Sequence, residues 1–173
     1  MSRTIGWFTS IYPVRFGLEG TDTGERIKAV KEQLRAVPNK GIGYGILVAL
    51  AGKLPMYTQK TVRFNYLGEI DNQLQDDDLH LMEMDTGNEQ AKENELTALV
   101  DLVGYVKQKQ FMLFVRYSSN QFSSETIDRF VERFFQELRS LIAYCCEREE
   151  GGYTPSDFET ASLSQEELDE LFT

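Results

Sequence analysis

Residues 96–117 read LTALVDLVGYVKQKQFMLFVRY, and this stretch decides the fold class. Its two arms alternate with a period of two residues, as side chains do on the faces of a β-strand. Polar residues 107–110 separate the arms, so the stretch predicts a β-hairpin. The residues that share a face are Leu96, Ala98, Val100 and Leu102 in the first arm, and Phe111, Leu113, Val115 and Tyr117 in the second.

A long amphipathic helix follows the hairpin. Ser123 or Ser124 provides its N-cap, and Gly151-Gly152 follows its end. Between these limits apolar side chains recur at spacings of three and four residues, which places them on one helix face, with Cys145 as a small core residue. They are Ile127, Phe130, Val131, Phe134, Leu138, Leu141, Ile142 and Cys145.

Two more helices are predicted on either side of a glycine-rich loop. Asp22 has the N-cap position of a helix that ends before Pro38, and Glu25 completes a capping-box pattern. Residues 38–45 form the loop. The apolar residues 46–54 then form a short buried helix.

Strand-forming residues are concentrated in three further segments: 4–18, in which Pro13 marks a bend or an edge position, 62–70 and 79–84. Residues 164–168 open a last short helix. The order along the chain is therefore one strand, two helices, four strands and two helices. This order predicts an α/β fold, with a mixed β-sheet flanked by helices.

Composition limits the class of protein. A chain of 173 residues and 19.9 kDa has room for one domain. Its 28 acidic and 18 basic residues give a net charge of -10, which argues against nucleic acid and membrane surfaces as partners. We expect no signal peptide and no apolar run of the roughly 18–20 residues that span a membrane. The two cysteines form no disulfide framework, so we expect a cytoplasmic protein.

Several motifs resemble functional sites only superficially. Glycines 41, 43 and 45 lack the GxGxxG spacing of a dinucleotide site, so a tight turn is the preferred interpretation. The acidic run at residues 76–78 lacks the order of a calcium loop, and His80 has no second imidazole for a metal site. We therefore expect no metal site and no cofactor bound by this chain.

Three segments, in order, are similar to signatures of one family. Residues 3–14 read RTIGWFTSIYPV, residues 38–45 read PNKGIGYG and residues 64–68 read FNYLG. Residues 154–158 (TPSDF) and 163–169 (LSQEELD) are similar to the family's exit segment. Together they resemble the epimerization domains of nonribosomal peptide synthetases. The Trp7 and Tyr12-Pro13 pattern favours these over the peptide-bond-forming condensation domains, which share the fold.

The resemblance implies that part of the domain is missing from this sequence. The family's domain has two halves related to chloramphenicol acetyltransferase, with an active-site tunnel between them. Its HHxxxDG and EGHGRE-like motifs precede the signatures found here. Residues 1–152 are accordingly expected to form the C-terminal half of such a domain, that is, one half of a chloramphenicol-acetyltransferase-like fold. Residues 153–173 are expected to form an exit segment or linker toward the next synthetase element.

The resemblance also implies a reaction. The intact family inverts the α-carbon of an aminoacyl or peptidyl group, which a peptidyl carrier protein presents as a thioester on its phosphopantetheine arm. Asn65 and Tyr66 match the FNYLG signature near the tunnel, and their amide and hydroxyl groups have the right chemistry for accessory roles. The acid and base would come from the N-terminal half of the domain, so the chain alone should be inactive.

The implied partners are that N-terminal half and the carrier protein, with self-association through the uncovered inner face. Two other functions remain open. The chain could be a non-catalytic interaction module that docks a carrier protein or a synthetase subunit. It could also be a small enzyme that uses Asp or Glu acid/base pairs, although no carboxylate pair stands out. The reading frame upstream of Arg3 separates fragment from module, because only the fragment would have HHxxxDG encoded there.

Overall fold

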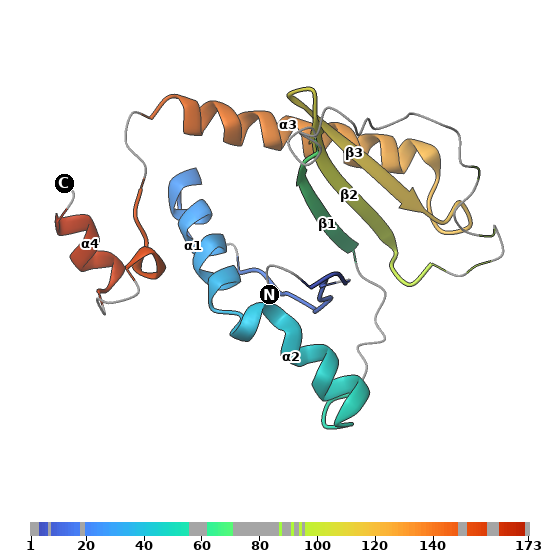
Figure 1. Cartoon of the computed structure of the whole chain (residues 1–173). Helices are drawn as coiled ribbons and strands as arrows, with labels where there is room; N and C mark the ends of the chain where they lie inside the picture. Colours follow the sequence, from blue (N-terminus) through green and yellow to red (C-terminus); the bar gives the residue numbers. More distant parts are fainter. Residues whose placement is uncertain are drawn as a thin grey trace. The chain divides into compact units, whose positions relative to one another are not determined.

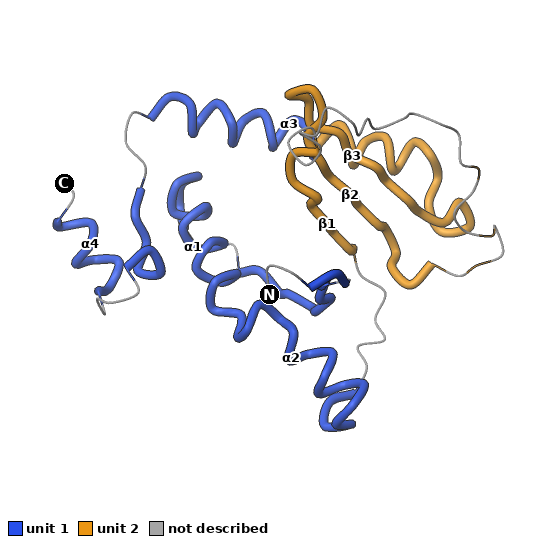
Figure 2. Tube along the Cα trace, in the orientation of Figure 1, with its two compact units in different colours: residues 1–57, 134–173 blue, residues 58–133 orange. Residues whose placement is uncertain are grey.

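The computed structural model of the chain describes residues 4–6, 8–17, 20–55, 62–70, 96–148, 152–158 and 163–171, together with residues 87, 91 and 94. The chain divides into two compact units (Figure 2). The first unit comprises residues 1–57 and 134–173, and the second comprises residues 58–133. The domain boundary predicted after residue 152 stays a prediction.

A three-stranded sheet organises the second unit (Figure 1). Its strands are β1 (Val62–Glu69), β2 (Val100–Lys107) and β3 (Gln110–Tyr117), and β2 lies in the middle. β1 runs parallel to β2, whereas β3 runs antiparallel to it. The sheet is therefore mixed, as predicted, and the strand predicted over residues 62–70 is confirmed. The hairpin is confirmed too, although its first arm begins at Val100 and not at Leu96.

The hairpin closes on a two-residue turn. Gln108 and Lys109 have φ angles of 50° and 61°, between the paired residues Lys107 and Gln110. Two consecutive positive φ angles are typical of the type I′ turn, whose twist matches the twist of the flanking strands. This turn fixes the register of β2 against β3, and with it which side chains share a face.

The hydrophobic core of the second unit lies between the sheet and the start of α3 (Ser124–Cys146). Val100 and Leu102 of β2 are buried together with Ile127 of α3. The long helix and the α/β class, a mixed sheet with a helix packed on it, are therefore confirmed. Partly buried apolar side chains surround this cluster: Leu99, Leu113, Val115, Tyr117, Phe122 and Val131.

Three helices begin at residues that the sequence marks as helix starts. In each, a side-chain oxygen accepts a hydrogen bond from a backbone N–H of the first turn, which has no acceptor inside the helix. The residues are Asp22 before α1 (Thr23–Arg35), Ser123 before α3 and Ser164 before α4 (Gln165–Leu171).

The second half of the glycine-rich segment, Ile42–Gly45, is helical rather than a loop. A 3-10 turn, η1 (Pro38–Gly41), leads into α2 (Ile42–Gly45) and then η2 (Ile46–Leu50). The loop predicted over residues 38–45 was therefore wrong for its second half. Gly45 has φ -59°, a helical angle, so here glycine marks no break in the helix.

The opening segment is another correction. Residues 4–6 and 8–17 form no strand, although their composition predicted one over residues 4–18. Phe8 and Ile11 are 65% and 66% exposed. Strand propensity mainly measures how well side chains fit a pleated surface beside neighbouring strands. No described strand pairs with this segment, so its apolar residues alone do not make it a strand.

Several predicted core positions are exposed, among them Phe130, Leu141 and Ile142 of the α3 stripe. The helix predicted within residues 46–54 forms, but Leu50 is 82% exposed. Cys145 is exposed near the end of α3, although it belongs to the same apolar stripe as the buried Ile127. An apolar stripe is buried only where another element covers it, and the sequence does not specify that cover.

The acidic run at residues 76–78, the strand predicted over residues 79–84 and His80 lie outside the described residues. In the part of the chain that the structure describes, no helix is both long enough and apolar enough to cross a membrane.

Candidate functional site

Asn65 and Tyr66 lie in the middle of β1, and strand geometry separates them. In the parallel register with β2, Asn65 is opposite Val103 and Tyr66 is opposite Gly104. Successive side chains of a strand point to opposite faces of the sheet. The two residues singled out from the sequence therefore lie in different surroundings, although they are neighbours in the chain.

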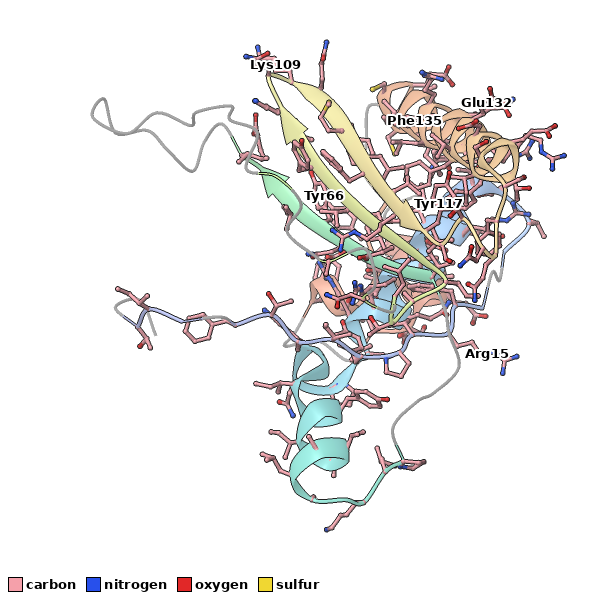
Figure 3. The ribbon with its side chains drawn as sticks, turned by 90° about the vertical axis from the view of Figure 1, so that its right-hand side faces the viewer. Arg15, Tyr66, Lys109, Tyr117, Glu132 and Phe135 are labelled. Atoms are coloured by element: carbon pink, nitrogen blue, oxygen red, sulfur yellow. The ribbon has the colours of Figure 1, made fainter. Side chains whose placement is uncertain are left out.

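Tyr66 shares its face of the sheet with the core residues of the second unit. Its partner Gly104 lies two residues beyond Leu102, which packs with α3. The rings of Tyr66 and Phe111 lie 6.4 Å apart between centroids. Figure 3 labels Tyr66 on β1. A Cβ atom at Gly104 would lie 2.9 Å from Cζ of Phe111 and 3.7 Å from Cδ2 of Tyr66. Glycine at this position leaves the space that the Phe111 ring occupies beside Tyr66.

The regular pairing of β1 ends directly after Tyr66. The register with β2 shifts between Tyr66 and Glu69, and Gly68 has φ 79° between them. Glycine adopts this left-handed conformation without a steric penalty. The FNYLG segment is thus a strand that ends in a bulge, and Tyr66 is its last regularly paired residue, 53% exposed.

The opposite face of the sheet, on which Asn65 lies, carries an ion pair between two strands. Arg63 donates from Nε to Oδ1 of Asp101 at 2.8 Å and from Nη2 to Oδ2 at 2.5 Å. Asp101 is only 7% exposed. The hydrogen bonds from Arg63 lower the pKa of Asp101, against the opposing effect of burial, so the carboxylate stays charged. This pair ties β1 to β2 two residues before Asn65.

The sequence contains a signal for this ion pair, although neither of its residues was predicted as a site residue. Asp101 is the only charged residue between positions 96 and 106, and Arg63 is the only one between positions 62 and 68. Isolated charges inside two apolar strands need a partner of opposite sign when they are buried. The missing information was the parallel pairing of β1 with β2, which puts the two residues opposite each other.

We expect Asp101→Asn to lower the free energy of unfolding by roughly 1–3 kcal/mol at neutral pH, less than for a fully buried pair because water reaches Arg63. Because the pKa of Asp101 is lowered in the folded chain, the pair stabilises the fold above the carboxyl's ordinary pKa of 3.8. This contribution is lost as the pH falls through the lower folded pKa. The acid limb of the stability curve should therefore flatten in the variant.

Urea unfolding at a series of pH values measures both effects. Glu132→Gln on α3 is the matched control, because Glu132 is an exposed acid in the same unit (Figure 3). It should change stability by no more than about 0.5 kcal/mol. Equal losses in the two variants would show that the Arg63–Asp101 pair adds no stability.

The other two family-like segments meet within the first unit. The Tyr12 ring lies so close to Gly41 that a Cβ atom there would be 1.9 Å from Cδ1 of Tyr12. The Ser10 hydroxyl donates to the Lys40 carbonyl at 3.0 Å. Gly41 is buried with φ 79°, after left-handed Asn39 and Lys40. The tight turn predicted at these glycines is therefore confirmed at Gly41, where it holds the opening segment.

The groups that these segments provide are hydrogen-bonding groups. The phenol of Tyr66 and the amide of Asn65 can stabilise negative charge that develops on a bound oxygen. No cluster of three or more His, Cys, Asp or Glu side chains suited to a metal ion occurs among the described residues. The third family-like segment, on β1, belongs to the second unit, whereas the first two belong to the first unit.

Comparisons with known proteins show which family has these features. The profile of the Condensation domain family matches residues 1–164. Surfactin synthase subunit 2 of Bacillus subtilis (strain 168) is 35% identical over 174 residues, which cover 99% of this chain and 5% of that protein. Tyrocidine synthase 1 of Brevibacillus parabrevis is 34% identical over 186 residues, which cover 99% of this chain and 17% of that protein. The chain thus spans a small part of these relatives.

A solved structure is similar in both sequence and fold. It is the epimerization domain from the third module of tyrocidine synthetase B, with 33% identity and a TM-score of 0.73. The match covers 86% of this chain and 34% of the solved chain. The chain therefore belongs to the condensation-domain family of nonribosomal peptide synthetases, and its fold matches that of an epimerization domain.

Proposed function

We propose that this chain is the C-terminal part of an epimerization domain. The intact domain converts an L-aminoacyl or peptidyl thioester, held on the phosphopantetheine arm of a carrier protein, into its D form. The observation that carries the proposal is the similarity to a solved epimerization domain, at 33% identity over 86% of this chain. The ordered RTIGWFTSIYPV, PNKGIGYG and FNYLG segments support it independently.

The reaction requires three groups. A base removes the α-proton on one face of the carbon, an acid returns a proton on the other face, and a hydrogen-bond donor stabilises the enolate-like oxygen. The sequence contains one histidine, so the histidine pair of HHxxxDG has to come from the N-terminal half of the domain. This chain contributes the donor.

Tyr66 is the donor that we favour. Its ring is positioned beside Phe111 and close to Gly104, and the residue is 53% exposed, which leaves room for a bound thioester to reach it. Asn65 faces the other side of the sheet because neighbouring strand residues alternate. A substrate bound on one face of the sheet can therefore accept a hydrogen bond from only one of these two residues. Asn65 is the alternative donor to Tyr66.

The test uses the full chain with and without the N-terminal half of its domain, and a carrier protein loaded with an L-amino acid. We expect no conversion by the chain alone, and formation of D-amino acid when the two halves are combined. Chiral chromatography of the hydrolysed thioester measures the conversion. Steady conversion by the chain alone would contradict the proposal, since no histidine pair is present to transfer the proton.

Apolar side chains that are exposed on β1 favour a second function, in which the chain binds another protein and catalyses no reaction. Val62, Phe64 and Leu67 are 54%, 53% and 48% exposed. Such a surface fits the other half of the domain, a carrier protein or a second copy of this chain. Sedimentation velocity in the same mixtures separates the functions, because a complex that forms but produces no D-amino acid supports docking alone.

A further inference from the structure

A row of charged side chains runs along one face of α1. Lys31 and Glu32 follow Lys28 by three and four residues, and Arg35 follows them by four and three, so the four side chains share this face. Lys31 Nζ lies 2.5 Å from Asp157 Oδ2, and Arg35 Nη1 lies 2.8 Å from Asp157 Oδ1. One carboxylate from the segment after α3 is thus held by two cations of α1.

Glu32, the acid in this row, binds the same segment through hydrogen bonds. Its Oε1 accepts from the Ser156 hydroxyl at 2.5 Å and from the Ser156 amide at 3.4 Å. Arg35 Nη1 also donates to the Ser156 hydroxyl at 3.0 Å. Burial raises the pKa of Glu32, but the hydrogen bonds from Ser156 and Thr154 outweigh it, so the pKa is lowered. The charged form of Glu32 is therefore the form that binds.

The segment has a local structure that presents these groups. Residues Pro155–Asp157 form the 3-10 turn η4, and Thr154 before it is completely buried. Asp157 Oδ2 accepts from the Thr154 amide at 3.0 Å while it also binds Lys31. The hydrogen bonds of Asp157 lower its pKa well below the usual range, with the bond from Lys31 as the largest cause.

A second contact holds α4. Lys28 Nζ lies 2.8 Å from Asp169 Oδ1. Gln165 Nε2 donates to the same Asp169 oxygen at 2.8 Å and to the Tyr153 carbonyl at 3.2 Å, which connects α4 to the start of the segment. Leu168 on α4 is 1% exposed. The segment therefore contacts α1 at two places, through η4 and through α4.

We propose that the charged row of α1 is the docking surface for two C-terminal pieces of this same chain, residues 152–158 and residues 163–171. Ion pairs hold the segment on α1, and the segment separates from α1 when these pairs are removed or screened. We call this contact the joint. Charge complementarity identifies the occupant, since two acids of the segment match three cations of the row. The family match ends at residue 164, so α4 follows it and is held on the domain by this joint. The proposal does not depend on epimerase activity.

Hydrogen exchange of the full chain, read by mass spectrometry, tests the proposal. In the double variant Lys31→Ala/Arg35→Ala, amides of residues 152–158 and 163–171 should exchange at least about tenfold faster, because two charge-assisted hydrogen bonds to Asp157 are lost. Amides of β2 and β3 should keep their rates. Arg15→Ala is the matched control, since Arg15 is an exposed cation of the same unit (Figure 3).

A charge exchange tests the second contact. Lys28→Asp alone should accelerate exchange in α4, and the double variant Lys28→Asp/Asp169→Lys should restore slow exchange by re-forming the pair with reversed sign. Unchanged exchange of residues 152–158 and 163–171 in the Lys31→Ala/Arg35→Ala variant would overturn the proposal. If that variant unfolds throughout, the unmutated chain is tested instead at about 0.05 and about 1 M NaCl. Salt screens exposed ion pairs, so the segment should exchange faster at the higher concentration. If the exchange rates of these residues do not change with NaCl concentration, the proposal is overturned.

Discussion

Gly41→Ala is expected to lower the free energy of unfolding by roughly 2–5 kcal/mol. An L residue in a left-handed conformation costs about 1–2 kcal/mol, and Gly41 has φ 79°. Overpacking adds about 1–3 kcal/mol, because the new methyl group would lie 1.9 Å from the Tyr12 ring and would displace it. Urea unfolding followed by circular dichroism measures the loss as a lower midpoint.

Gly43→Ala is the matched control for this variant. Gly43 belongs to α2, and no heavy atom lies within 4 Å of the position its Cβ would take. Alanine in a helix is more stable than glycine by about 0.8–1 kcal/mol, so the control should be unchanged or slightly more stable. If the two variants behave alike, the Tyr12–Gly41 contact does not stabilise the first unit.

Tyr66→Phe is expected to slow epimerization in the intact domain by roughly 10²–10³-fold, because the loss of one donor at a centre of developing charge has this effect. The fold should be unchanged within about 0.5 kcal/mol, since the ring and its contact with Phe111 remain. The rate of D-amino acid formation under single-turnover conditions, with loaded carrier protein, is the measurement.

Two further variants make this result specific. Tyr105→Phe removes a hydroxyl from the opposite face of the sheet, where the Tyr105 ring stacks with Phe114, and should keep the parental rate. Asn65→Ala tests the alternative donor on that face. A parental rate in Tyr66→Phe with a slow Asn65→Ala would transfer the accessory role to Asn65. Parental rates in both would assign the FNYLG segment a packing role.

Local chemistry made part of this fold predictable. The β-hairpin and the helix caps at Asp22 and at Ser123 or Ser124 depend on residues close in sequence; the hairpin is confirmed, and the caps form at Asp22 and Ser123. Burial was harder to predict, because it depends on which element covers a side chain. Cys145 and Leu50 have apolar patterns like that of Ile127, but only Ile127 lies beneath a sheet.

The candidate site shows the same limit. Asn65 and Tyr66 were found because they match a family segment, but the sequence could not show that they face opposite sides of the sheet. That follows from the regular pairing of β1 up to Tyr66. Arg63 and Asp101 were missed because they are 38 residues apart in sequence and meet only through a parallel pairing.

The same parallel pairing makes β1 the entropically most expensive strand of the sheet. β3 joins β2 through a two-residue turn, whereas Arg63 and Asp101 close a loop of 38 residues. Loop-closure entropy grows by about 0.6 kcal/mol for each doubling of length, so attaching β1 costs roughly 2–3 kcal/mol more than closing the hairpin. We therefore expect local opening of this sheet to start with β1, the strand that carries Tyr66, and we expect the Arg63–Asp101 ion pair to oppose it.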